Sequence, residues 1–145
     1  MFSKSCEYGI KALIYIATQS LEDNRVKIGD VAEKAGCPEA FTAKILGLLT
    51  KKQIVNSLTG PTGGFFISKE AMQEIKISEI VKIIDGDEIY NGCALGLNEC
   101  SSHEPCPMHS RFTKIREELK QMLKTTSVYD LAIGLQAGKT VLVRI

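Results

Sequence analysis

The feature that most restricts what this chain can fold into is a pair of helical patterns joined at a single glycine. The first pattern, residues 28–35, places its apolar side chains on one face: Ile28, Val31, Ala32 and Ala35. Gly36 follows, and glycine favours the left-handed position just past a helix end. Pro38 then suits the first turn of a second helix of about fourteen residues. Two helices with so tight a joint predict a helix-turn-helix.

A short hairpin is expected directly after the second helix. Strand-forming residues occupy 53–58 and 64–68, and the segment between them, from Thr59 to Gly64, is rich in glycine and other turn residues. A helix-turn-helix followed by such a hairpin is a winged helix. The sequence therefore predicts a mainly α fold with a small β-wing, in which residues 1–86 form a winged helix-turn-helix.

Further helical patterns flank this unit. One covers residues 3–20, Ser68 is expected to cap a short helix that ends near Ile75, and Ser78 is expected to cap a helix over 79–85. The stretch that follows, up to residue 106, shows no periodicity. A long irregular segment inside a compact protein is typical of a functional loop, so residues 87–106 are predicted to form one.

The last strong helical pattern, at 107–124, carries a narrow apolar seam. Its members repeat in alternating steps of four and three: Met108, Phe112, Ile115, Leu119 and Met122. Such a seam is typical of helices that pair with one another, so 107–145 is predicted to hold a long dimerisation helix and a C-terminal tail. The alternative is packing of this helix onto its own N-terminal domain. Residues 128–135 fit a short helix, and 139–145 fit a tail or a short strand.

A winged helix reads DNA with the N-terminal part of its second helix, which enters the major groove. The residues expected to be exposed there are Glu39, Ala40, Thr42, Ala43 and Lys44, beside a buried stripe of Phe41, Ile45, Leu48 and Leu49. Two lysines at the helix end and the tip of the wing are expected to contact phosphates or the minor groove: Lys51, Lys52, Thr59, Gly60, Pro61, Thr62 and Gly63. The predicted partner is double-stranded DNA. The alternative is a protein-interaction module whose lysines are solvated.

The composition limits these functions. The formal net charge is only +1, so a DNA-binding face has to be a local patch. No apolar run approaches the ~18 residues that span a bilayer, and the first residues lack the apolar core of a signal peptide. A soluble cytoplasmic protein without a membrane partner is therefore expected. No Ser/His/Asp set, phosphate-cradling loop or paired carboxylates point to an enzyme.

Three of the five cysteines lie close together in the predicted loop. Cys93, Cys100 and Cys106 are separated by six and five residues, and His109 follows Cys106 after two. The absence of a Cys-x-x-Cys pair makes an ordinary zinc knuckle a poor match, whereas an iron–sulfur cluster tolerates wider spacing. Structural zinc and thiol-only redox sensing are the alternatives. His109, and less so His103, are candidates for a fourth ligand. Cys6 and Cys37 are expected to be small buried hydrophobes.

The order of motifs resembles the Rrf2 family of winged-helix transcription regulators, which includes the iron–sulfur regulators IscR and NsrR. The motifs that carry the resemblance are Glu7-Tyr8-Gly9-Ile10-Lys11-Ala12-Leu13, Ile28-x-x-Val31-Ala32-Glu33, Leu48-x-x-Lys51-x-x-Ile54-Val55, Gly60-Pro61-x-Gly63-Gly64-Phe65 and the three-cysteine loop. The resemblance covers nearly the whole chain.

This resemblance implies a homodimer joined through the long helix and a cluster held by the three loop cysteines, [2Fe–2S] in preference to [4Fe–4S]. In some members a histidine shortly after the third cysteine completes the ligand set, and His109 matches it. In others an acidic residue in the first helix of the partner subunit does so, and Glu7 matches that residue. The implied function is a regulator whose affinity for DNA follows iron, redox or nitric oxide status.

Overall fold

The computed structural model describes residues 1–144 and confirms a mainly helical fold with a small two-stranded wing. In the described residues the elements follow in the order α1 (Lys4–Leu21), α2 (Ile28–Ala35), α3 (Glu39–Lys51), β1 (Asn56–Leu58), β2 (Gly64–Phe66), α4 (Lys69–Glu74), α5 (Ile77–Asp85), α6 (Glu88–Asn91), α7 (His109–Thr125) and α8 (Val128–Gln136).

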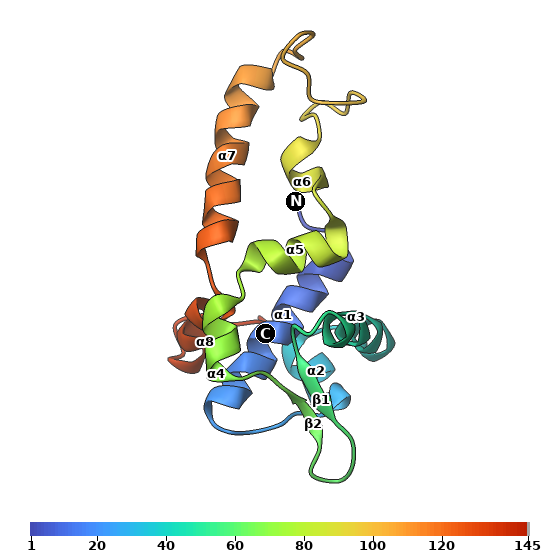
Figure 1. The fold of residues 1–145 in the computed structure, drawn as a ribbon, viewed down its shortest axis with the longest axis vertical. Helices are drawn as coiled ribbons and strands as arrows, with labels where there is room; N and C mark the ends of the chain where they lie inside the picture. Colours follow the sequence, from blue (N-terminus) through green and yellow to red (C-terminus); the bar gives the residue numbers. More distant parts are fainter. Residues whose placement is uncertain (145) are drawn as a thin grey trace.

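Helix α1 lies in the middle of the molecule. Its alternating three- and four-residue spacing turns a wide apolar face inward, and its fully or nearly fully buried residues are Cys6, Ala12, Leu13, Ile16 and Ala17. Helices α2 and α3 pack on one side of α1, and α5 and α8 pack on others (Figure 1). One continuous apolar core joins residues from all five of these helices.

The helix-turn-helix forms as predicted at its joint. Gly36 adopts the left-handed conformation at the end of α2, with φ 66° and ψ 42°. The predicted buried stripe of α3 is partly wrong, because Phe41 and Leu48 are exposed. The side chains that face the core instead come from Thr42, Ile45, Leu46 and Leu49. Phe41, one position off this face, meets the ring of Tyr8 edge-on at 5.5 Å.

The wing is a hairpin of two three-residue strands, shorter than the sequence predicts. Ser57 pairs with Phe65 in the antiparallel register. Val26, in the link between α1 and α2, forms an isolated bridge on the other edge of β2, with its N–H donating to Phe65 O and its carbonyl accepting from Phe65 N. Through this bridge the α1–α2 link pairs with the free edge of the hairpin and fixes the wing to the body.

The helices after the wing begin as local capping and core packing require. Ser68 caps α4 as predicted, because its hydroxyl accepts from the N–H of Ala71. The expected cap at Ser78 is wrong: α5 begins at Ile77 with Lys76 as its N-cap. Ile77 is buried and donates its N–H to Thr126 O, so packing against the segment before α8 starts this helix earlier.

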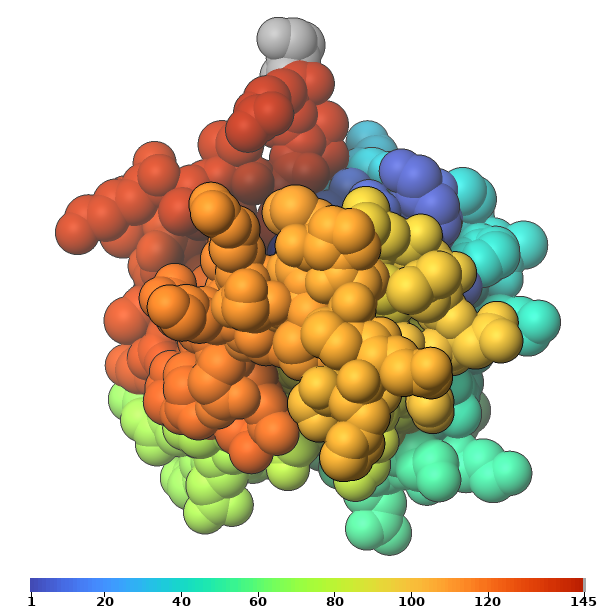
Figure 2. Space-filling model, turned by 90° about the horizontal axis from the view of Figure 1, so that it is seen from above, coloured from blue at the N-terminus to red at the C-terminus, as the bar shows by residue number. Residues whose placement is uncertain are grey.

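The segment expected to be irregular contains one short helix, α6, before the cysteines. Residues 92–108 then form turns and bends without further helix or strand. Figure 1 shows α6 and α7 side by side above the body, with this loop at their far end and the wing at the opposite end of the molecule. Seen from the loop end, the loop and the start of α7 stand in front of the body (Figure 2).

The seam of α7 divides into two parts. Phe112 and Leu119 are half-buried and, together with Ile115, help to line an apolar pocket of about 440 Å³ between α7, α6 and the loop. Met108, Ile115 and Met122 are the exposed members of the seam, at 42%, 62% and 50%. These three lie seven residues apart and so share one face of the helix.

The chain after α7 returns to the body. Helix α8, predicted over 128–135, is present and packs mainly on α1 and α4. Its buried residues Val128 and Ala132 belong to the same core as α1. Residues 139–144 form no strand, and Ile145, the last residue of the predicted tail or strand, lies outside the described residues.

Gly64 gives a test of the wing's attachment. Its φ is +137°, and a Cβ built on it would lie 2.7 Å from Val26 O and 2.9 Å from two other backbone atoms of Val26. We expect Gly64→Ala to lower the free energy of unfolding by about 2 kcal/mol or more, because backbone has to move and the conformation is strained. Urea denaturation followed by circular dichroism measures this.

Gly47→Ala is the matched control for this substitution. Gly47 lies in the exposed part of α3, and its Cβ would meet nothing within 4 Å. Alanine is favoured over glycine inside a helix by about 1 kcal/mol, so this variant should be more stable than the parent. Equal stabilities of the two variants would contradict the close approach at Val26.

Candidate DNA-binding surface and cysteine site

The N-terminal part of α3 presents a mixed surface to solvent. Glu39, Ala40, Ala43 and Lys44 are exposed there. Thr42 is completely buried, so its expected exposure is wrong. Its hydroxyl donates to Pro38 O at 2.7 Å, which fixes the start of the helix instead of leaving the side chain free for a partner.

The remaining candidates for DNA contact lie at the end of α3 and on the wing. Lys51 and Lys52 are exposed, as is the wing tip from Thr59 to Thr62. Gly63 is buried, contrary to its expected place at the contact surface. A Cβ at Gly63 would lie 2.1 Å from Leu58 O, so glycine is required there to let the two strands of the wing meet.

Cys93 lies at the start of a turn, in which its carbonyl accepts from the N–H of Gly96 at 3.1 Å. The amides of Leu97 and Leu95 lower the pKa of the Cys93 thiol most, and the Cys106 side chain and the amide of Gly96 lower it further. Hydrogen bonds to a sulfur favour its thiolate form. Cys93 and Cys106 are therefore neighbours, although thirteen positions apart in the chain (93 to 106).

Cys100, the middle one of the three loop cysteines, is held against α7. Cys100 Sγ lies 3.2 Å from His109 Nδ1 and 3.1 Å from Nη2 of Arg116. The other terminal nitrogen of Arg116 donates to Gly92 O, and the guanidinium lies over the Phe112 ring. Arg116 therefore ties the start and the middle of the cysteine loop to α7.

Sequence reasoning missed this role of Arg116. Arg116 is not a member of the apolar seam of its helix, and nothing else in the sequence singles it out. Its position one turn beyond Phe112, facing the cysteine segment, could have been inferred only if the path of the loop had been known. A guanidinium carries five donors in a planar fork, which suits it to bridge a carbonyl and a sulfur.

The other candidate ligands lie apart from these two pairs. Glu7, in the first turn of α1, forms an ion pair with Lys4 at 3.4 Å. His103 is exposed at the tip of the loop. Cys6 is buried as predicted, and burial raises the pKa of its thiol to about 12, with Asp85 adding to the effect. Among residues 1–144 no three His, Cys, Asp or Glu side chains converge on one point.

The fold and these surfaces define a class of protein. A helix-turn-helix followed by a wing, with an exposed second helix, is a winged-helix DNA-binding domain. The profile of the Rrf2 family, described as an iron-dependent transcriptional regulator, matches residues 2–133, and the chain belongs to this family. It is therefore a DNA-binding transcriptional regulator and not an enzyme.

Individual relatives agree with this assignment. A protein of Aquifex aeolicus named as an HTH-type transcriptional regulator is 31% identical over 133 residues, 90% of each chain. The regulator IscR of Photorhabdus laumondii is 24% identical, over 86% of this chain and 74% of its own.

Solved structures show the same fold. CymR, the global cysteine regulator of B. subtilis, superposes with a TM-score of 0.74 at 21% identity, over 92% of this chain and 96% of its own. IscR of T. potens superposes with a TM-score of 0.72 at 18% identity, over 97% and 92%. No helix in the described part of the chain is long and apolar enough to cross a membrane.

The environments of the cysteines predict their order of reactivity in metal-free protein. Alkylation needs an accessible thiolate. The pKa of Cys93 is lowered and that of Cys37 is raised by burial, while Cys6 is buried with a pKa of about 12. We expect iodoacetamide at pH 7 to label Cys93 before Cys37, and Cys6 only after unfolding. Timed labelling with peptide mass spectrometry measures this. Labelling of Cys6 as fast as Cys93 in the folded protein would contradict the assigned environments.

Proposed function

We propose that this chain acts in the cytoplasm as a homodimeric regulator whose affinity for an operator is controlled by a [2Fe–2S] cluster in the 93–106 loop. The observation that carries the proposal is the arrangement of the loop donors in two pairs, Cys93 with Cys106 and Cys100 with His109. A [2Fe–2S] cluster takes two protein ligands on each iron. Two pairs of donors on one loop therefore support this cluster type.

The surroundings of the donors fit a cluster of thiolate ligands. The backbone amides of Leu97 and Leu95 favour the thiolate of Cys93 by lowering its pKa, and Cys100 accepts a hydrogen bond from Arg116. Such bonds stabilise the negative charge that thiolates and bound sulfides carry, and they help to set the reduction potential of a cluster. When bound, the cluster would supply the sensitivity to iron shortage, oxidants and nitric oxide.

His109 is the better supported of the two candidates for the fourth ligand. Its ring nitrogen already lies within 3.2 Å of Cys100 Sγ, at the start of a rigid helix. Glu7 is part of an ion pair on a different helix, and the family resemblance implies that it would act from the partner subunit. Neutral imidazole is also a softer donor than carboxylate.

The exposed stripe of α7 supports the homodimer. Met108, Ile115 and Met122 present large apolar side chains to solvent along one face of the helix. A row of apolar side chains at heptad spacing is stabilised when it packs against a second helix. Pairing of α7 with its copy would cover this stripe and bring the two loops into one assembly.

The cluster predicts visible colour that depends on the loop. Anaerobic reconstitution with ferrous iron and sulfide should give charge-transfer absorption, with about two irons and two sulfides bound per chain, because three thiolates and one imidazole can hold one [2Fe–2S] unit. Cys100→Ala should lose this absorption and keep its far-UV circular dichroism. Cys37→Ala, a cysteine outside the loop, should keep both.

Two further variants separate the candidates for the fourth ligand. His109→Ala should change the spectrum or the rate of cluster loss in air, and Glu7→Ala should leave both unchanged. A colourless parent protein after reconstitution would contradict the cluster. If regulation of DNA binding then followed thiol oxidation, or if the protein held zinc instead, a cluster-free mode of control would replace the proposal.

The dimer predicts a response to charge on α7. Ile115→Glu combined with Met122→Glu should give a monomer at micromolar concentration, because burial of two carboxylates in an apolar interface costs several kcal/mol. Sedimentation velocity measures the mass. Gln121→Glu adds a carboxylate to the same helix off the stripe and should leave the dimer intact. A doubly substituted protein that remains dimeric would place the interface elsewhere.

A further inference from the structure

The wing of this chain carries no charged side chain of its own. From Gln53 to Ser68 the sequence contains neither lysine, arginine, aspartate nor glutamate. Attraction between a protein and duplex DNA comes largely from cationic groups that replace counterions along the phosphates. A wing that lies on DNA therefore needs cations from another segment.

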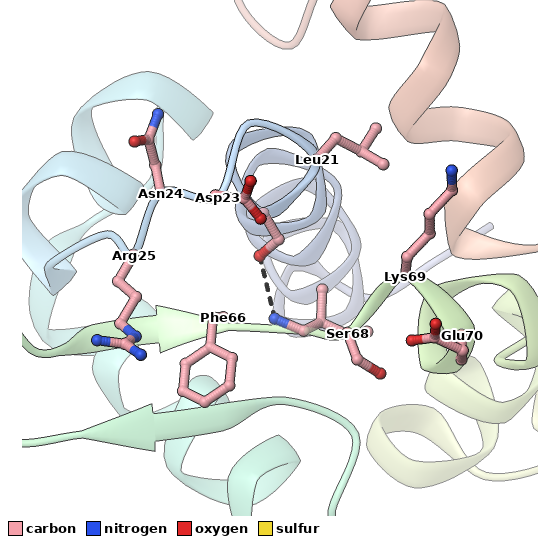
Figure 3. A pocket seen from close by; sticks show the side chains of 10 residues that line it. Leu21, Asp23, Asn24, Arg25, Phe66, Ser68, Lys69 and Glu70 are labelled. Atoms are coloured by element: carbon pink, nitrogen blue, oxygen red, sulfur yellow. Dashed lines mark hydrogen bonds between the residues drawn. The ribbon is translucent and has the colours of Figure 1, made fainter.

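The structure places two cations from the α1–α2 link over the wing. Val26 pairs with Phe65 on the edge of β2 and turns its side chain into the core. Side chains alternate along an extended segment, so Arg25 and Lys27 share the opposite, exposed face. Figure 3 shows the side chain of Arg25 extending from the link towards the strands, beside the ring of Phe66.

Each cation is held on the wing by contacts to neutral groups. Lys27 Nζ donates to Gly60 O at the tip of the wing. Arg25 Nη1 donates to Thr62 O at 3.4 Å, and its guanidinium stacks 5.2 Å from the centre of the Phe66 ring. A carbonyl uses one donor and neutralises no charge. Lys27 keeps two N–H groups and Arg25 keeps four for another acceptor.

The acidic groups nearby do not neutralise these cations by contact. Asp23 and Asp30 line the same polar groove between the link, α2 and the wing loop as Arg25 and Lys27. Neither carboxylate lies within 4.0 Å of either cation, and the ion pair that the described residues do form joins Lys4 to Glu7 at the start of α1. The two positive charges are thus pre-positioned at the wing and still available.

We propose that Arg25 and Lys27 supply the phosphate contacts of the wing, so that the α1–α2 link and the hairpin bind the backbone of duplex DNA as one unit. This assignment rests on the DNA-binding function and adds two residues to it. The hydrogen bonds to Gly60 and Thr62 set the distance between the cations and the wing tip, and the Val26 bridge sets their direction.

The probe for the test is a duplex selected by the full-length protein from a random library of about 30 base pairs, long enough for two half-sites of a dimer. Fluorescence anisotropy gives the dissociation constant over a series of salt concentrations. The slope of log affinity against log salt counts the phosphates that the protein contacts, at about 0.9 per contact.

The variants Arg25→Gln and Lys27→Gln remove the charge and keep a side-chain donor for the wing carbonyl. Each should lower the magnitude of the salt slope by about 1 and weaken binding roughly five- to tenfold at about 0.1 M salt. The double variant should lower the slope by about 2. Arg25→Lys and Lys27→Arg keep the charge and should restore most of the slope.

Two control variants test the charge change and the location separately. Lys114→Gln removes a cation from exposed α7, far from the wing (Figure 1), and should leave the slope unchanged. Asp30→Asn removes a negative charge from the same groove and should strengthen binding. Urea midpoints of all variants report on folding.

The outcomes separate this assignment from the DNA-binding function itself. A salt slope that the two Gln variants leave unchanged would overturn the assignment, even if affinity falls, because the residues would then only brace the wing. A parent protein that selects no duplex and binds none in a salt-dependent way would overturn both the assignment and the function beneath it.

Discussion

Burial of α1 between the helix-turn-helix and the helices α5 and α8 is the packing interaction on which the rest of the structure depends. Leu13 and Ile16 are buried at its centre, and burying such a side chain contributes about 1.5–3 kcal/mol. Helix α5 leads into the segment made of α6, the cysteine loop and α7, and α8 follows it. Because α5 and α8 both pack on α1, the two ends of this segment are fixed to α1. The isolated bridge between Lys76 and Ser127 joins the two ends of this segment at its base. What extends beyond this base is α6, the loop and most of α7.

The sequence predicted well those features whose conformation depends only on interactions between residues close together in the chain. Gly36 ends α2 and Ser68 caps α4 because a left-handed residue and a hydroxyl at an N-cap act on their immediate neighbours. The predicted cap at Ser78 was wrong because a contact with a distant part of the chain determines where α5 begins. The backbone of Ile77 finds its acceptor in Thr126, which is distant in sequence. A local rule has no access to that contact.

Apolar periodicity predicted which helices are amphipathic but not which residues of each face meet the core. On α3 the inward face is shifted by one position, so that Thr42 is buried and Phe41 is exposed. On α7 the members of one seam differ in burial, since Phe112 is half-buried while Ile115, which lines the same pocket, is mostly exposed. The candidate ligands could be chosen from spacing. Their grouping into pairs, and the part played by Arg116, depend on a loop path that spacing does not determine.

The distance between the two functional ends restricts how one can control the other. The cysteine loop and the wing lie at opposite ends of the molecule (Figure 1), so the proposed cluster could not alter DNA contacts by touching them. Within one chain, a structural change at the loop would have to pass from α6 and α7 through α5 and α8 to α1. The packing around α1 is too tight to deform gradually. Rigid rotation of whole subunits about a shared α7 interface is the motion that leaves this core intact. The proposed mechanism therefore requires a dimer, because the quantity that such a rotation changes is the spacing between the recognition helices of the two subunits.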